Sequence, residues 1–488
     1  MQRKFLFNLA LLVLLNLLVK PFYILAVDTE FIVRLGQEVY GAYFALFNLS
    51  ILTNIFLDFG TVNFNTGNIA RNENLVTKHF SHILSLRMAL AMLYVLISLL
   101  TGLILGYRGV SIYHLFLLCI NQVLAGFILY FRSNLAGMQL FPQDSLLSVL
   151  DRLVLILSCS FVLWIHPLKD LSIELFIYLQ TAAYSTGVLA GLVLVVRKAG
   201  RPGFRLKLPF TYLIMKKSFP YALLVLLMGF YYRTDGVMLE RMLDDGSYQA
   251  GIYAQAFRFY EAGNMMALLF ATLLFPMYSR LISQNDDVRP LLNTSFKLLT
   301  TGAVYLSFLG YFYANDIMDI RYDSGIAESA KAFKYLMIGF IGVSGTYIFG
   351  ALLTANQSMR SLNGMAMFGV VVNIVLNLIL IPTYKAEGAA FASMSTQLIL
   401  AAYQIILVRR EVQVGLSLKT WLGMAAFALI MALSFLSLHE LKWDFAMASA
   451  SCLGLAVFLV FLFRLITLSQ MKDLLRIQRE SKEVPAEP

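Results

Sequence analysis

The chain has 488 residues, of which 59% are hydrophobic and only 14% charged, and its mean hydropathy is +0.74. Soluble domains carry about 25% charged residues, so this composition excludes a string of soluble domains. The net charge of +10 does not indicate nucleic-acid binding, because basic residues gather between apolar stretches long enough to cross about 30 Å of hydrocarbon. All three cysteines fall inside such stretches, which argues against a disulfide framework or a cysteine metal site.

In chain order, the apolar stretches predict an all-α integral membrane protein with fourteen transmembrane helices. The first stretch imitates a signal peptide, but it has no convincing cleavage site, so we interpret it as a retained helix. An even number of spans puts both termini on one side of the membrane. The predicted helices lie near residues 5–27, 39–60, 83–106, 112–138, 144–165, 171–196, 213–243, 249–280, 291–314, 330–354, 360–382, 388–408, 415–438 and 443–467.

The distribution of Lys and Arg sets the orientation of these helices. With the N-terminus inside, the inner segments hold 26 of the 38 basic residues and the outer loops hold nine. This bias follows the positive-inside rule and predicts that both termini are cytoplasmic. The strongest cluster, RKAGRPGFRLKLPFTYLIMKK at 197–217, is then a topology anchor that can also contact anionic lipids, rather than a nucleic-acid patch.

Two short repeats indicate an internal duplication. GAYFALF at 41–47 matches GIYAQAF at 251–257, and LAGMQ at 135–139 matches LTANQ at 353–357. The offsets of about 210 residues predict two parallel six-helix lobes, related by a pseudo-twofold axis along the membrane normal. The predicted domains are an N-lobe at 1–200, a C-lobe at 201–412, and two appended helices with a cytoplasmic tail at 413–488. No GxxxxGK[ST] phosphate loop is present, so ATP bound to this chain does not drive it.

Three cations, Lys20, Arg233 and Arg258, lie well inside predicted spans. At 1.5 Å per residue, the two arginines lie roughly 13–15 Å below the outer surface, and Lys20 reaches a similar level. Charges at this depth are costly in lipid, so we expect all three to face a wet cavity between the lobes. Simpler roles remain open: Lys20 can snorkel to an interface, Arg233 can pair with Glu261 or Asp58, and Arg258 can form a structural bridge with Glu261.

A second group of polar residues can serve ion coupling. Asn373 and Asn377 are four residues apart on one predicted helix and share a face. With Asp235 and Ser393, their oxygens could replace water around Na⁺, because hard cations prefer oxygen ligands. The alternative is that the two amides hydrogen-bond between helices and only support packing.

Three segments together resemble one family of membrane proteins. They are LGQEVYGAYFALFNLSILTNIFLDFG from residue 35, YYRTDGVMLERMLDDGSYQAGIYAQAFRFYEAGNMM from residue 231, and ANQSMRSLNGMAMFGVVVNIVLNLILIPTYKAEGAAFAS from residue 355. They are similar to motifs of polysaccharide transporters (Wzx-like oligosaccharidyl-lipid flippases) in the multidrug/oligosaccharidyl-lipid/polysaccharide exporter superfamily. The resemblance covers most of residues 30–400 and does not extend to the last two helices.

The resemblance implies a flippase in the bacterial inner membrane and no enzymatic activity. Its substrate would be a polyprenyl-pyrophosphate-linked oligosaccharide, a precursor of O-antigen, capsule or exopolysaccharide, and its neighbours would include membrane lipids and a glycan polymerase or other biosynthesis proteins. Lys20, Arg233 and Arg258 would bind the pyrophosphate. Coupling to Na⁺ or H⁺ is expected through Asp235, with Glu261 in reserve, and no other cofactor is expected.

Lipid II flippases share this fold and imply a sodium site at Asp235, Asn373, Asn377 and Ser393. Here Asn377 stands where a carboxylate belongs in that pattern, and only Lys20 represents their Arg-rich first two helices, so lipid II is the alternative substrate.

A multidrug or cation antiporter would present carboxylates rather than three cations. A glycosyltransferase or polymerase needs a larger outer loop, and a membrane scaffold remains the alternative without transport.

Overall fold

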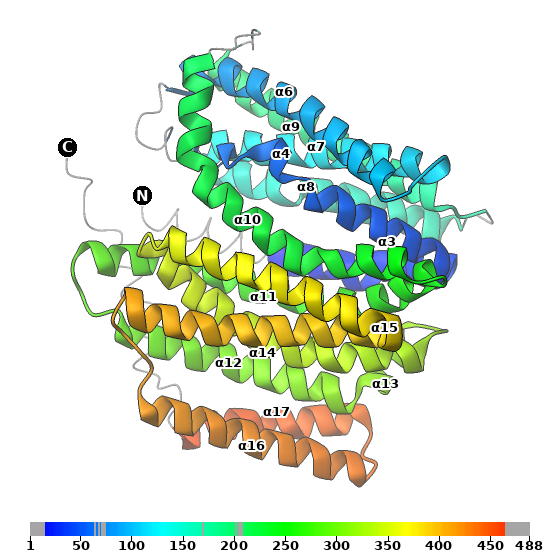
Figure 1. Ribbon diagram of the computed structural model, residues 1–488, viewed down its shortest axis with the longest axis vertical. Coiled ribbons are helices and arrows are strands. Elements are labelled where there is room, and N and C mark those ends of the chain that lie inside the picture. The colour runs from blue at the N-terminus through cyan, green and yellow to red at the C-terminus, as the bar shows by residue number, and fades with distance from the viewer. Residues whose placement is uncertain are drawn as a thin grey trace. The chain divides into compact units, whose positions relative to one another are not determined.

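Helices account for all regular structure among the described residues, and no strand occurs there (Figure 1). The computed structural model describes residues 15–62, 65–66, 69, 75–167, 170–200, 203 and 208–463. The chain forms two compact units, Met1–Ala254 and Gln255–Pro488. The all-α class predicted from the sequence is thereby confirmed. The start of the first predicted helix, part of the basic cluster at 197–217 and the C-terminal tail lie outside the described residues.

The N-terminal unit is a bundle in which α9 packs against α7 and α8, and α3 packs against α10 and α7. Its long helices are apolar around most of their circumference, as expected of helices that contact both protein and lipid. Its elements are η1 (Tyr23–Asp28), α2 (Thr29–Leu35), α3 (Gln37–Leu52), α4 (Ile55–Asp58), α6 (Leu75–Ile104), α7 (Val110–Gly137), α8 (Phe141–Ser160), η2 (Phe161–Ile165), α9 (Ile173–Ala199), α10 (Leu208–Met242) and the first turns of α11 (Gly246–Ser283).

The first helix changes its winding after Pro21. Residues 15–22 are helical, Tyr23–Asp28 form one π-helical stretch, and α2 continues to Leu35. Proline has no N–H and clashes with the preceding turn, and such local defects in a helix often occur at functional sites. The helix therefore extends beyond the predicted end at residue 27, and Asp28 becomes a buried residue.

The C-terminal unit is built around α14. This helix packs against both α12 and α15, and α16 and α17 pack together and against α12 (Figure 1). The unit comprises the rest of α11, α12 (Arg289–Phe312), α13 (Ala314–Arg321), α14 (Ile326–Ala355), α15 (Met359–Glu411), α16 (Leu418–Glu440) and α17 (Phe445–Leu462).

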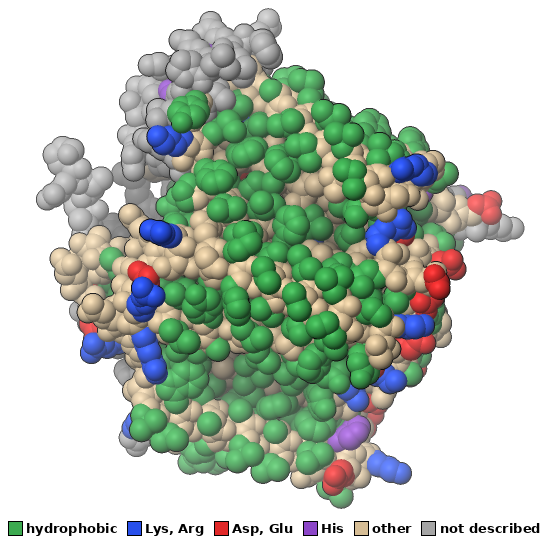
Figure 2. Space-filling view, in the orientation of Figure 1, with side chains coloured by type: hydrophobic (Ala, Val, Ile, Leu, Met, Phe, Trp, Pro, Cys, Tyr) green, Lys and Arg blue, Asp and Glu red, His purple; other side chains and the backbone are tan. Residues whose placement is uncertain are grey.

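The predicted count of fourteen spans is not confirmed. Ten helices among the described residues are long and apolar enough to cross a membrane. One of them, α15, runs through two predicted spans and turns at Lys385, whose φ is 52° and ψ is −131°. Two other predicted spans are not among these ten helices. The helix α3 is too short, with only 16 residues, and α12 is not apolar enough, because it carries many polar side chains. Figure 2 shows hydrophobic side chains over the helix middles on the face in view and charged ones near the helix ends.

Candidate functional site

Arg233 and Asp235 both lie on α10, in the N-terminal unit. Asp235 is 1% exposed and accepts a hydrogen bond of 2.7 Å from the Tyr253 hydroxyl. Arg233 is half-buried, donates to Asn48 Oδ1 at 3.3 Å, and has its guanidinium 5.3 Å from the Tyr232 ring centre. The carboxylate therefore contributes to packing between α10 and α11, and the arginine connects α10 to α3.

Arg258 and Glu261 form an ion pair on α11, in the C-terminal unit. Arg258 Nη1 lies 2.6 Å from Glu261 Oε2, and both residues are buried. The sequence spacing predicts this contact, since residues three apart are neighbours on a helix. A phosphate that binds Arg258 has to compete with Glu261 for the guanidinium.

Three candidate ion-coupling residues of the C-terminal unit lie on α15, and the fourth, Glu261, lies on α11. Asn373 and Asn377 are fully buried, and Asn377 Nδ2 donates to Asn373 Oδ1 at 3.1 Å. Ser393 is also buried and follows the turn at Lys385. In the described part of the chain, no cluster of three or more His, Cys, Asp or Glu could hold a metal ion. This hydrogen bond lies within one helix, whereas the alternative that the sequence left open was a hydrogen bond between helices.

Lys20 lies in a group of charges that the sequence did not predict. It is half-buried, and the charges of Arg152, Arg132 and Asp151 act on it. Within the described residues, no carboxylate lies within salt-bridge distance of its ammonium group. Arg152 is the twelfth residue of the 25-residue helical span Phe141–Ile165, roughly 16 Å along the axis from its start.

Aromatic rings and carboxylates hold the two arginines of this group. The Arg152 guanidinium lies 4.9 Å from the Tyr23 ring centre and 5.4 Å from that of Tyr184, and Asp151 is 3.7 Å away. Arg132 Nε donates to Asp144 Oδ1 at 2.7 Å. We call Lys20, Arg132 and Arg152 the N-terminal cation cluster. It brings together residues of the first helix, α7 and α8.

Sequence reasoning missed this cluster because it assigned residues 132–152 to an inner segment. The span predicted at 144–165 already contained Asp151 and Arg152, and that was the available signal. Asp28 was missed as well, since the first helix was ended at residue 27. Asp28 is 2% exposed and accepts a hydrogen bond of 2.9 Å from the Tyr40 hydroxyl. Its charge also acts on Tyr23 and Tyr184.

Asp58 has a structural partner in the same unit. Arg87, only 1% exposed, donates to Asp58 Oδ1 at 2.5 Å, to Thr61 Oγ1 at 2.7 Å and to the Gly126 carbonyl at 2.9 Å. These bonds tie the end of α4 to α6 and α7. Asp58 is thus the counter-ion of Arg87, in the turn that closes α4.

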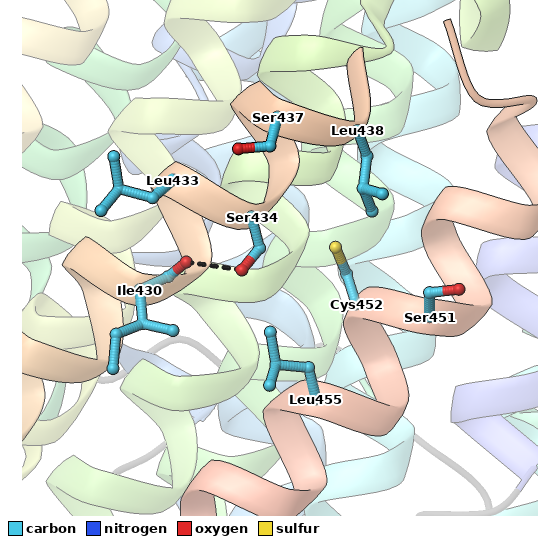
Figure 3. Close-up of a pocket in the computed structure, with 8 residues that line it drawn as sticks. All are labelled: Ile430, Leu433, Ser434, Ser437, Leu438, Ser451, Cys452 and Leu455. Carbon is cyan, nitrogen blue, oxygen red and sulfur yellow. Dashed lines mark hydrogen bonds between the residues drawn. The ribbon is translucent and has the colours of Figure 1, made fainter. Parts of the chain in front are cut away.

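An apolar groove of about 410 Å³ lies between α16 and α17 (Figure 3). Its lining combines leucine and isoleucine with three serines and Cys452. Ser434 Oγ donates to the Ile430 carbonyl at 2.8 Å, so this hydroxyl is satisfied within its own helix. No charged side chain lines the groove, so it suits a hydrocarbon chain better than a phosphate.

The family model for polysaccharide biosynthesis proteins matches residues 8–282, more than half of the chain. This chain belongs to that family. No curated protein sequence matched this chain.

Several solved transporters share the fold of this chain. The lipid II flippase MurJ, in an inward closed conformation, has a TM-score of 0.67 and 15% identity over 94% of this chain and 97% of that one. An inward-facing multidrug resistance MATE family transporter of the MOP superfamily has a TM-score of 0.59 and 11% identity, over 80% of this chain and 94% of that one. A MOP superfamily transporter from Pyrococcus furiosus has a TM-score of 0.59 and 12% identity, over 83% of this chain and 95% of that one. The family resemblance found in the sequence is confirmed by the family model, and these structures show a shared fold.

Proposed function

We propose that the protein is a flippase that moves polyprenyl-pyrophosphate-linked oligosaccharides from the inner to the outer leaflet of the bacterial inner membrane. Membership of the polysaccharide biosynthesis family supports the substrate class. The shared fold with a lipid II flippase supports the activity. The glycan would be a repeat unit of O-antigen, capsule or exopolysaccharide.

The observation that carries the proposal is the number of cations within apolar helices. Lys20, Arg152 and Arg233 lie in the N-terminal unit and Arg258 in the C-terminal unit. Charges inside membrane helices are rare and usually mark a substrate or ion pathway. Arginine binds phosphate oxygens through two parallel N–H bonds, and lysine adds a point charge, so this composition suits a diphosphate.

In the proposed mechanism, the head group binds these cations while the polyprenyl chain stays in lipid, and the two lobes alternate between inward and outward access. Substrate can drive the switch only through different affinities for the two states. Entry of Na⁺ or H⁺ would reset the cycle, since a membrane potential of 100 mV supplies about 2.3 kcal/mol per charge. Asp235 is the proposed coupling carboxylate, with Glu261 in reserve and Asn373, Asn377 and Ser393 as further oxygen donors.

Lipid II transport is the second candidate, favoured by the likeness to the lipid II flippase over 94% of this chain. A multidrug antiporter is disfavoured, because cationic drugs are recognised by carboxylates and the cations here would repel them. The Pyrococcus furiosus transporter offers a parallel, since its reversed pocket polarity was taken to suggest a different function.

A leaflet assay in vesicles tests the function. Fluorescent polyprenyl-pyrophosphate oligosaccharide is placed in one leaflet of vesicles with and without protein, and an impermeant quencher reports its location over time. We expect the protein to expose the label on the opposite side and lipid II to move more slowly. Equal rates with and without protein would refute the flippase, and faster movement of lipid II would favour the second candidate.

A further inference from the structure

We propose that the C-terminal unit holds a binding site for a phosphoethanolamine head group, between α14 and the turn of α15 at Lys385. The head group can belong to a membrane lipid or to a soluble molecule, and the ammonium group is the part that is recognised. A cavity of about 310 Å³ lies at this position, lined by Tyr335, Leu380, Tyr384, Glu387, Gly388 and Phe391. None of these residues belongs to the cations or the ion-coupling residues described above, so the site does not depend on the proposed function.

The turn within α15 creates the cavity. Lys385 has a φ of 52° and a ψ of −131°, a conformation that residues with a side chain rarely adopt. Gly388 permits the close packing of this turn, because a methyl group there would lie 2.6 Å from the Leu380 carbonyl oxygen and 3.0 Å from Cβ of Tyr384. The chain changes direction within a few residues, so residues on both sides of the turn line one cavity together with α14.

Three aromatic rings line the cavity and suit a cation. The rings of Tyr335 and Phe391 have centres 5.3 Å apart and planes at 82°, so they form two walls nearly at a right angle. Tyr384 lines the same cavity from the other side of the turn. The faces of aromatic rings attract cations, and groups of such rings bind ammonium ligands. Tyr384 is 57% exposed and Phe391 is 39% exposed, so a ligand can reach the rings.

One carboxylate completes the lining of the cavity. Glu387 is half-buried and is a hydrogen-bond partner of the Tyr335 hydroxyl. A hydroxyl occupies only one of the acceptor positions of a carboxylate, so others remain for an N–H donor. A single carboxylate is a poor site for a hard metal ion, which needs several oxygen ligands. A primary ammonium group fits better, because it donates to the carboxylate and contacts the rings at once, whereas a quaternary ammonium group has no N–H.

Lysines beside the cavity favour a zwitterion over a simple amine. Lys334 precedes Tyr335 on α14, and its ammonium group lies 5.7 Å from the ring centre of Tyr311, which also acts electrostatically on Tyr335. Lys385 lies in the turn and is exposed. These positive charges would repel an amine that carries no negative charge, but they attract a phosphate. A phosphoethanolamine head group matches both parts of this arrangement.

Native mass spectrometry of the purified full chain in detergent tests the site. The probes are phosphatidylethanolamine and phosphatidylcholine with identical acyl chains, which have the same net charge and differ only in the ammonium group. A hydrogen bond to a charged group contributes roughly tenfold in affinity, so we expect phosphatidylethanolamine to have the lower Kd by about that factor. E387Q should remove this difference between the lipids. F391L removes one ring and should raise the Kd of phosphatidylethanolamine about threefold or more.

Two matched controls separate the site from general contact with lipid. E440Q removes an exposed carboxylate at the end of α16, and F161L removes an exposed ring on η2; neither residue lines the cavity. Both variants should leave the two Kd values unchanged. Aromatic residues are common near membrane surfaces, and an ordinary aromatic belt predicts the same effect for F161L and F391L.

That equal effect would refute the site, and so would equal binding of the two lipids or a preference that survives E387Q. If E387Q does not fold, the comparison of F391L with F161L decides: a higher Kd in F391L alone supports the site, and any other result refutes it.

Soluble phosphoethanolamine distinguishes the two sources of the head group. If it displaces phosphatidylethanolamine at a Kd similar to that of the lipid, the site recognises the head group alone. If the lipid binds roughly tenfold tighter or more, its acyl chains contribute and a membrane lipid is the ligand. If neither binds, the site is refuted. Because binding is measured without transport, none of these results decides the flippase proposal, which the leaflet assay tests.

Discussion

At the scale of single residues, the ion pair between the buried Arg87 and the partly exposed Asp58 makes a quantitative prediction. Arg87 is almost completely buried and satisfies Asp58, Thr61 and a backbone carbonyl on α7. Breaking a fully buried pair costs about 3–5 kcal/mol, but Asp58 is 34% exposed and water can solvate its charge, so the cost here should lie below that range. We expect Arg87→Met to lower the thermal stability of the purified protein strongly, as measured by its melting temperature in detergent.

Two further variants complete this test. Arg34→Gln removes a half-exposed pair and should change stability by less than about 1 kcal/mol. The double variant of Arg87→Met with Asp58→Asn should recover part of the lost stability, since no charge is then stranded. A double variant that is less stable than the sum of the two single changes would contradict the assigned pairing.

The candidate site shows how far single residues can be read from sequence. Arg258 and Glu261 are three residues apart, and helical geometry alone predicts their contact. The partners of Arg152 come from the first helix and from α9, far away in the chain, so no local spacing reveals them. Asp28 was missed because a π-helical stretch carries the first helix past its predicted end.

At the scale of elements, a close approach of α3 and α11 within the N-terminal unit has a mutational consequence. A methyl group on Gly41 would lie 1.8 Å from the Ser247 carbonyl oxygen, and one on Gly251 would lie 2.0 Å from that of Gln37. We expect Gly41→Ala or Gly251→Ala to cost about 1–3 kcal/mol through overpacking. The change should appear as a lower melting temperature and a lower yield of folded protein.

Gly229, on α10 of the same unit, is the matched control. A methyl group there meets no atom within 4 Å, so Gly229→Ala should be neutral or stabilise the helix by about 0.5–1 kcal/mol. If all three glycine variants behave alike, the two helices do not pack through these glycines. The repeat that matched 41–47 with 251–257 thus contains both glycines of this contact, although sequence similarity alone did not indicate that they touch.

At the scale of the whole molecule, the membrane topology is the main expectation that remains to be measured. Hydropathy recovers the long helices because each must bury about 20 apolar residues, and it predicts a span at 291–314, although α12 carries polar side chains that lower its mean hydropathy. Single cysteines on either side of α12 test whether it spans. Asp323 and Asn285 are exposed, and the three native cysteines are buried, so background labelling should be low.

We expect an impermeant maleimide to label Asp323→Cys in intact cells and to label Asn285→Cys only after the membrane is opened. Labelling of both positions in intact cells would show that α12 does not cross the membrane. The opposite pattern would invert the predicted orientation and place both termini outside. Either result would also revise which loops follow the positive-inside rule.

The placement of Asp151 and Arg152 at the middle of α8 has a consequence for biogenesis. A charged residue at the centre of an isolated helix raises the free energy of insertion by about 2.5–3.5 kcal/mol on translocon scales. The rings of Tyr23 and Tyr184 become available only when the first helix and α9 have been synthesised. Nascent α8 should therefore wait beside the translocon, or be held by an insertase, until α9 emerges from the ribosome and the bundle can close around the arginine.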